Sequence, residues 1–245
     1  MQSISKNKEF LNNLFKKHFD EDFINKVSSA YDEYLNAYKS KHGEIHAWYS
    51  YNRSNNVGWD YNAVPRKPGN TGKYPIQEMS EVSAYLKGLL NTHNLATLAF
   101  IMMNPEKFKG LTFCDFGAGM GVMGAFISKL GYECYNYDNF YHVSNMGDTV
   151  GLHKFLFDRG VSMKEVLSTP PPKKIDVLMV HGIYAEDSDF FDSNDNFKYL
   201  FLDKRYDTWP SSIEFLKKRA HALCHKQNLL SHMALYCLCD EVDND

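Results

Sequence analysis

The fold of this chain is predicted mainly from one stretch, Leu111-Thr-Phe-Cys-Asp-Phe-Gly-Ala-Gly-Met-Gly121. An apolar run carrying one acid leads into three glycines at alternate positions, and a second apolar run of helical character follows them. Glycine tolerates positive φ angles and lets a backbone pass close to a ligand, because it has no side chain. The stretch therefore predicts a strand, a tight glycine turn and a helix whose first N–H groups lack partners within the helix.

A second apolar run, Tyr132-Glu-Cys-Tyr-Asn-Tyr-Asp138, ends in a carboxylate 17 positions beyond Gly121. A parallel strand next to the first one would present this carboxylate at the edge where the glycine turn lies. Carboxylates at this position in open α/β sheets bind ribose hydroxyls. The two runs together predict a site for a ligand that contains a nucleoside.

The rest of the chain from residue 106 alternates between expected strands and helices, which indicates a doubly wound, mostly parallel α/β sheet. Further strands are expected over Val161–Leu167, Ile175–His181, Phe197–Asp203 and His232–Cys239, and helices over Val143–Gly160 and Ser211–Lys226. We predict two domains, a helical and loop-rich cap over residues 1–105 and an α/β core over residues 106–245. Apolar spacing of three and four predicts the helices of the cap over Phe10–Tyr38, where two helices are expected, Ser80–Leu90 and Leu95–Met103.

The segment from His46 to Tyr61 mixes aromatic residues with asparagines and has no helical period, so we expect a loop. Long loops in compact proteins often serve as lids or binding loops. One interpretation is a flap that closes over a substrate, with Trp48 and Trp59 as contact residues. The other is a surface connection that its aromatic side chains anchor to the core, and the sequence favours neither.

Composition narrows the classes of function. The formal net charge of −3 and the pI near 6.4 lack the basic excess of a general nucleic-acid binder, so nucleic acid is disfavoured as a partner. No apolar run reaches the roughly 18 residues of a membrane span, and the first residues lack a secretory signal, so we expect a cytoplasmic protein. The five cysteines contain no C-x-x-C pair, and we expect reduced thiols and no metal site.

Two cofactors compete for the predicted site. Gly119-Met-Gly-Val-Met-Gly124 matches the dinucleotide pattern G-x-G-x-x-G, and Asp138 lies 19 residues after Gly119. If Gly117 opens the pattern instead, its sixth position is Val122 rather than glycine. Asp115 would also repel a pyrophosphate by several kcal/mol at an effective dielectric near 20. S-adenosylmethionine has no phosphate and carries an ammonium and a sulfonium, which an acid suits.

The run Asp115-Phe-Gly-Ala-Gly-Met-Gly121 followed by Asp138 resembles the first two motifs of class I S-adenosylmethionine-dependent methyltransferases. The resemblance covers residues 111 to about 182. It implies a Rossmann-like core that binds S-adenosylmethionine. By match to the motifs, the implied cofactor-binding residues are Asp115, Gly117, Gly119, Gly121 and Asp138. The chain departs from the family after the third expected strand, where Leu167-Ser168-Thr169 offers hydroxyls instead of an acid or an amide for the adenine.

Methyl transfer is an in-line displacement, and a hydroxyl acceptor also needs a base. His181, at the end of an apolar strand, is the candidate catalytic base, with hydrogen bonding within its loop as the alternative role. Tyr184 and Glu186 follow it and, with Trp48 and Trp59, are the candidate substrate contacts. We expect a small-molecule acceptor and favour O- over N-methylation. An NAD(P)-dependent oxidoreductase and a non-catalytic partner subunit with the same fold remain the alternatives.

Overall fold

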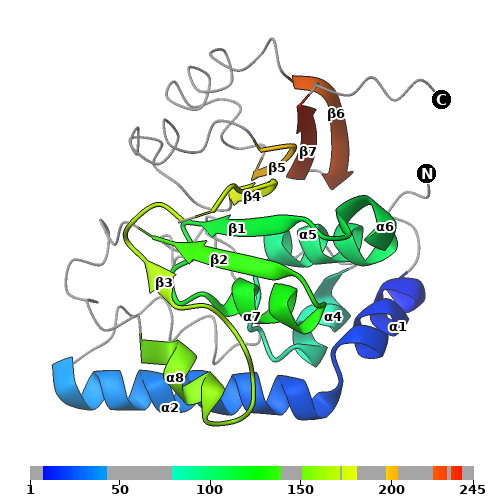
Figure 1. Cartoon of the computed structure of the whole chain (residues 1–245). Helices are drawn as coiled ribbons and strands as arrows, with labels where there is room; N and C mark the ends of the chain where they lie inside the picture. Colours follow the sequence, from blue (N-terminus) through cyan, green and yellow to red (C-terminus); the bar gives the residue numbers. More distant parts are fainter. Residues whose placement is uncertain are drawn as a thin grey trace, which may run out of the picture.

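The computed structural model describes residues 8–42, 79–138, 151–171, 173–180, 197–203, 223–230 and 233–238. Its centre is a seven-stranded sheet with the strand order β3-β2-β1-β4-β5-β7-β6 (Figure 1). The strands are β1 (Thr112–Phe116), β2 (Glu133–Tyr137), β3 (Val166–Leu167), β4 (Val177–Val180), β5 (Tyr199–Asp203), β6 (Leu223–Leu230) and β7 (Met233–Leu238).

Strands β1 to β5 are parallel, and β7 runs antiparallel between β5 and β6. The chain winds outward from β1 to β3, then returns to the centre and winds the other way through β4 and β5. The predicted doubly wound, mostly parallel sheet is confirmed. The order reverses between β1 and β4, and ligands of such sheets bind at the carboxyl ends of the strands near this reversal.

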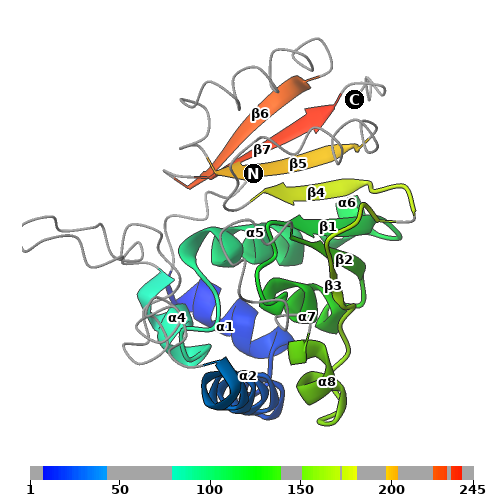
Figure 2. The same cartoon turned by 90° about the vertical axis from the view of Figure 1, so that its left-hand side faces the viewer.

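Most of the described helices lie on one side of the sheet, with α5 and α7 next to the strands and α2 farther away (Figures 1 and 2). The helices are α1 (Lys8–His18), α2 (Glu21–His42), α4 (Ser80–Tyr85), α5 (Thr92–Met103), α6 (Pro105–Phe108), α7 (Val122–Lys129) and α8 (Leu152–Phe157). None of these described helices is both long and apolar enough to cross a membrane.

The two helices predicted over Phe10–Tyr38 are confirmed as α1 and α2. The second begins directly after Asp20, whose Oδ1 atom accepts a hydrogen bond of 2.8 Å from the Phe23 N–H group. This contact satisfies one of the N–H groups that a helix start leaves without an intrahelical partner. A local cap of this kind separates one amphipathic stretch into two helices.

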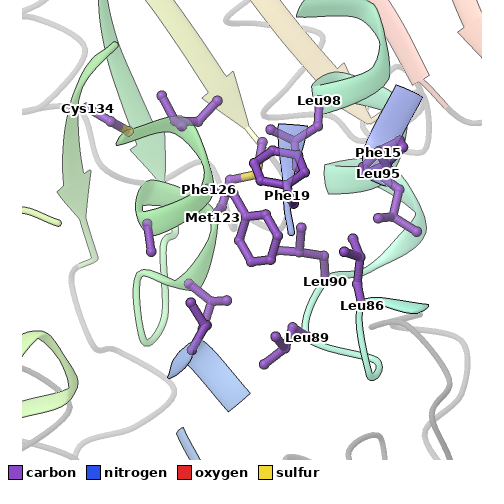
Figure 3. Packing of buried hydrophobic residues seen from close by; sticks show 14 of the residues in the cluster. Phe15, Phe19, Leu86, Leu89, Leu90, Leu95, Leu98, Met123, Phe126 and Cys134 are labelled. Carbon is purple, nitrogen blue, oxygen red and sulfur yellow. The ribbon is translucent and has the colours of Figure 1, made fainter. Parts of the chain in front are cut away.

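Aromatic side chains fix α7 against the N-terminal helices. The ring of Phe126 on α7 lies 4.9 Å from that of Phe19 and 5.1 Å from that of Phe23, edge to face in both pairs. Figure 3 shows Phe126 and Met123 beside Phe19 within one packed cluster. The division at residue 105 stays a prediction, and the described helices on both sides of it contribute to this core.

The helix predicted over Ser211–Lys226 is wrong for its last four residues, which belong to strand β6. Strand β6 pairs with β7 as a hairpin, with Leu230 opposite Met233. Cross-strand pairing overrides a weak local pattern.

Two more elements are shorter than predicted. Helix α4 ends at Tyr85 rather than at Leu90, because Lys87 and Gly88 both have positive φ angles that a helix cannot continue. Strand β3 contains two residues where the sequence predicts Val161–Leu167. The residues before β3 instead run as irregular backbone, and they pack beside the glycine turn described below.

Glu133 begins β2 at the amino ends of the parallel strands. Its Oε1 atom lies 2.5 Å from Lys164 Nζ and 3.3 Å from Lys173 Nζ. The hydrogen bond from Lys164, helped by those from Lys173 and Tyr135, lowers the pKa of Glu133 from 4.5 to about 2. Lys164 Nζ also stands 3.7 Å from the centre of the Tyr135 ring. This cluster ties β2 to the segments before β3 and β4.

We expect Glu133 to stabilise the folded state above pH 4.5, where it is ionised in both states, and to lose this contribution as the pH falls towards 2. The side chain is 34% exposed, so solvent screening limits the contribution to about 1 kcal/mol. Urea unfolding of the wild type and of Glu133→Gln should differ by that amount near pH 6 and by about half or less near pH 3. The same difference at both pH values would contradict the assignment.

Candidate cofactor site

The glycine turn begins directly after β1. Gly117, Gly119 and Gly121 have φ angles of 75°, 54° and 75°, which residues with a side chain rarely adopt. The turn ends at α7, whose start at Gly121 has no side-chain cap. The predicted order of strand, glycine turn and helix is confirmed, and the sequence needs its three glycines here for the backbone conformation itself.

The end of β2 holds the turn in place. The N–H groups of Gly117 and Ala118 both donate to the carbonyl oxygen of Tyr137, at 2.8 and 3.0 Å. The N–H group of Gly119 donates to Asp138 Oδ2 at 2.7 Å. The backbone N–H of Asp138 in turn donates to the carbonyl oxygen of Leu167, at 3.0 Å. Asp138 and the glycine turn, separated in sequence, are thus brought together at the carboxyl ends of β1, β2 and β3.

Asp115 is the penultimate residue of β1 and is only 3% exposed. It lies opposite Asn136 of β2 and Met179 of β4. Since side chains alternate along a strand, Asp115 shares a sheet face with Phe113, which belongs to the core beneath the helices. The structure places a buried carboxylate two residues before the turn, where the sequence predicts the first acid of the site.

Gly121 is required by internal packing as well as by its φ angle. A Cβ atom at this position would lie 2.6 Å from Met163 Cε and 2.9 Å from Val166 Cγ2. Its N–H group donates to the carbonyl oxygen of Ala118 at 2.9 Å. Gly117 and Gly119 are half-buried, whereas Gly121 is buried, so the first two are the glycines whose backbone remains accessible.

The geometry argues against a pyrophosphate at this turn. Phosphates at such sites are held by N–H groups of the turn and of the helix start, and here the three turn glycines, Gly117, Gly119 and Gly121, donate their N–H groups within the chain instead. From the turn to the end of α7 the only basic residue is the last, Lys129, which cannot neutralise a phosphate at the start of the helix. The glycine at position 124, which completes the dinucleotide pattern, packs against Asn136.

Five predicted site residues lie outside the described part of the chain: His181, Tyr184, Glu186, Trp48 and Trp59. Strand β4 ends at Val180, which pairs with Phe116 of β1. His181 is the next residue in sequence after that strand end. Among the described residues, no group of three His, Cys, Asp or Glu side chains is arranged to hold a metal ion.

Sequence reasoning missed two residues that support the turn, Asn136 and Met163. Asn136, the penultimate residue of β2, is 2% exposed, and Met163 comes from the irregular segment before β3. A single amide within the apolar run of residues 132–137 was the available signal for Asn136. Met163 had no signal, because its segment was predicted to be a strand.

Comparison with known proteins gives a likeness of fold. No protein-family model matches the sequence, and no curated protein matches it. The chain is similar to the tRNA (uracil-54, C5)-methyltransferase of Pyrococcus abyssi in complex with S-adenosyl-L-homocysteine, with 14% identity, a TM-score of 0.41, and coverage of 61% of this chain and 38% of that one. It is also similar to a ribosomal protein L11 methylase from Lactobacillus delbrueckii subsp. bulgaricus, with 16% identity, a TM-score of 0.40, and coverage of 58% and 77%.

By their names, both of these proteins are methyltransferases. The Rossmann-like core of this chain is shown by its own strand order. The matched region spans well under two thirds of the Pyrococcus chain. At these identities the likeness concerns the fold alone, so activity has to be argued from the site.

The predicted partner is corrected by these structures. We expected a small-molecule acceptor with nucleic acid disfavoured, whereas by their names the two similar proteins act on tRNA and on a ribosomal protein. Nucleic acid was disfavoured because of the formal net charge of −3, which is a sum over the whole chain and does not describe a local surface. We therefore withdraw the small-molecule assignment.

Proposed function

We propose that this chain binds S-adenosylmethionine at the carboxyl ends of β1 and β2 and transfers the methyl group of that cofactor. The observation that carries the proposal is the contact between the Asp138 carboxylate and the Gly119 N–H group, 2.7 Å long, beside the buried Asp115. This arrangement brings the accessible backbone of Gly119, the acid proposed to bind the ribose, Asp138, and a second acid, Asp115, to the same end of the sheet.

The charges favour this cofactor over a dinucleotide. Asp115 and Asp138 both flank the turn, and no lysine or arginine lies between Asp115 and the start of α7. Two unit charges of the same sign at about 4 Å repel by about 4 kcal/mol at an effective dielectric near 20. A pyrophosphate would meet this repulsion, whereas an ammonium or a sulfonium gains from the same field.

Each residue then has a definite task. Gly117 and Gly119 let the cofactor approach the backbone, because no side chain projects from them. Asp138 accepts the Gly119 N–H group on one oxygen, and a carboxylate has further lone pairs for ribose hydroxyls. Asp115 adds negative charge beneath the turn. When bound, the sulfonium supplies a methyl group that an aligned acceptor displaces in line.

The acceptor side of the proposal rests on sequence alone. His181, directly after β4, is proposed to take a proton from a hydroxyl acceptor, and the preference for oxygen depends on it. Tyr184, Glu186, Trp48 and Trp59 are proposed to contact the acceptor. The class of acceptor is left unassigned.

Calorimetry with S-adenosylmethionine, S-adenosylhomocysteine and NADH tests the cofactor directly. We expect the two adenosyl compounds to bind with dissociation constants in the micromolar range, about −8 kcal/mol, and NADH to give no heat of binding. Binding of NADH alone would overturn the proposal in favour of the oxidoreductase. Binding of none of the three would overturn it in favour of a non-catalytic member of the fold.

A further inference from the structure

Asn136 is a buried amide on the face of β2 that lies beneath α7. It is 2% exposed, and its Nδ2 atom donates to the carbonyl oxygen of Lys164 at 2.7 Å. Cys134, two residues before it on β2, belongs to the apolar core, and Asp115 of β1 lies opposite Asn136. The amide therefore ties the irregular segment before β3 to the carboxyl end of β2.

The same side chain fills the space beside α7. A Cβ atom added to Gly124 would lie 2.7 Å from Asn136 Nδ2 and 2.8 Å from its Cγ, and closer still to its amide oxygen. Met163 and Val166, on either side of Lys164, fill the space beside Gly121. One amide thus sets the distance between β2, the first turn of α7 and the segment that supports the glycine turn.

The buried amide of Asn136 makes the folded state less stable than an apolar side chain of similar size would. Asn136 Oδ1 is buried and has no hydrogen-bond partner among the described residues. A buried acceptor without a partner destabilises the folded state, and an apolar side chain of similar size would avoid this penalty. Its oxygen does face the first turn of α7, the positive end of that helix, which offsets part of the cost.

We propose that Asn136 is a positioning residue for the cofactor site, which holds the segment before β3 against Gly121 and so keeps the glycine turn in its binding conformation. The cofactor part of this inference rests on the proposed function. Without the bond to Lys164, Met163 and Val166 lose one of the contacts that hold them beside Gly121. The ion pair of Lys164 with Glu133 and the pairing of Val166 with β2 remain, so the segment loosens without detaching. The turn, and with it the contact from Gly119 to Asp138, then becomes less ordered.

The test compares Asn136→Leu with Asn104→Ala in the full chain. Asn104 is the matched control, because its Nδ2 atom also donates to a backbone carbonyl, that of Phe100, at 2.8 Å, on the far end of α5. Three quantities are measured for each protein: the melting temperature, hydrogen exchange of the peptide that contains residues 117–121, and the dissociation constant for S-adenosylhomocysteine.

For Asn136→Leu we expect a melting temperature no lower than that of the wild type, exchange of the turn amides about tenfold faster, and a dissociation constant about tenfold higher. Asn104→Ala should lower the melting temperature and leave both turn exchange and affinity unchanged. If Asn136→Leu does not fold, Asn136→Ala takes its place. Its turn exchange should then be faster and its dissociation constant for S-adenosylhomocysteine higher than those of the wild type.

Wild-type exchange of the turn in a folded Asn136 variant would overturn the inference. So would equal acceleration of turn exchange by Asn104→Ala, because the effect would then be general destabilisation. Failure of the wild type to bind S-adenosylhomocysteine would remove the proposed function, while the exchange comparison would still decide whether Asn136 positions the turn.

Discussion

Replacement of Asp138 by alanine should weaken the binding of S-adenosylhomocysteine by about 100-fold, measured by calorimetry. A hydrogen bond to a charged group contributes about 1.5–3 kcal/mol, and the substitution removes the carboxylate that is proposed to hold the ribose hydroxyls. It also removes the acceptor of the 2.7 Å bond from Gly119, so the turn itself loses an anchor. Affinity should fall through both effects.

Asp176→Ala is the control for this experiment. Asp176 Oδ2 accepts a hydrogen bond of 3.0 Å from the N–H group of Thr112, at the opposite end of β1. Both substitutions remove a carboxylate that accepts a backbone N–H, and only one of them lies at the proposed site. We expect Asp176→Ala to lower the melting temperature while the dissociation constant stays within about twofold. An Asp138→Ala protein that binds as tightly as the wild type would show that the carboxylate is not part of the site.

Gly121→Ala should be strongly destabilising, by about 2–5 kcal/mol in urea unfolding. The φ angle of 75° costs an alanine about 1–2 kcal/mol. The new Cβ would also meet Met163 Cε at 2.6 Å and Val166 Cγ2 at 2.9 Å, and such overpacking typically costs about 1–3 kcal/mol. The two costs add because one concerns the backbone and the other the neighbours.

Gly110→Ala separates these two costs. Gly110 has a φ angle of 73°, close to that of Gly121, and a Cβ there would have nothing within 4 Å. Its substitution should cost about 1–2 kcal/mol, the conformational part alone. Equal losses for the two variants would mean that Met163 and Val166 do not pack against Gly121. Adding Met163→Ala to Gly121→Ala should recover part of the packing loss.

The features that the sequence predicted correctly depend on local rules. The glycines predict the turn because only glycine adopts its positive φ angles at low cost. The start of α2 is marked by Asp20, whose side chain caps the Phe23 N–H group. Asp138 could be placed next to the turn because the carboxyl ends of neighbouring parallel strands lie at the same edge of the sheet. A carboxylate at the end of β2 must therefore lie near the turn that follows β1. These signals are contained in a few adjacent residues.

The features that the sequence did not predict depend on distant contacts. Strand β6 forms because it pairs with β7. The residues His225–Asn228 show no alternation of apolar and polar side chains that would predict a strand. The supporting role of Asn136 depends on Lys164 and Gly124, which come from two other segments. Neither pairing nor packing across such separations leaves a periodic trace in a single sequence.

A crystal structure with S-adenosylhomocysteine bound is the most direct test of the proposed cofactor site. We predict that the ribose hydroxyls lie within hydrogen-bond distance of the Asp138 carboxylate, which keeps its contact with Gly119, and that the ligand passes over Gly117 and Gly119. A ligand bound elsewhere on the sheet, with Asp138 in contact with no ribose oxygen, would contradict it.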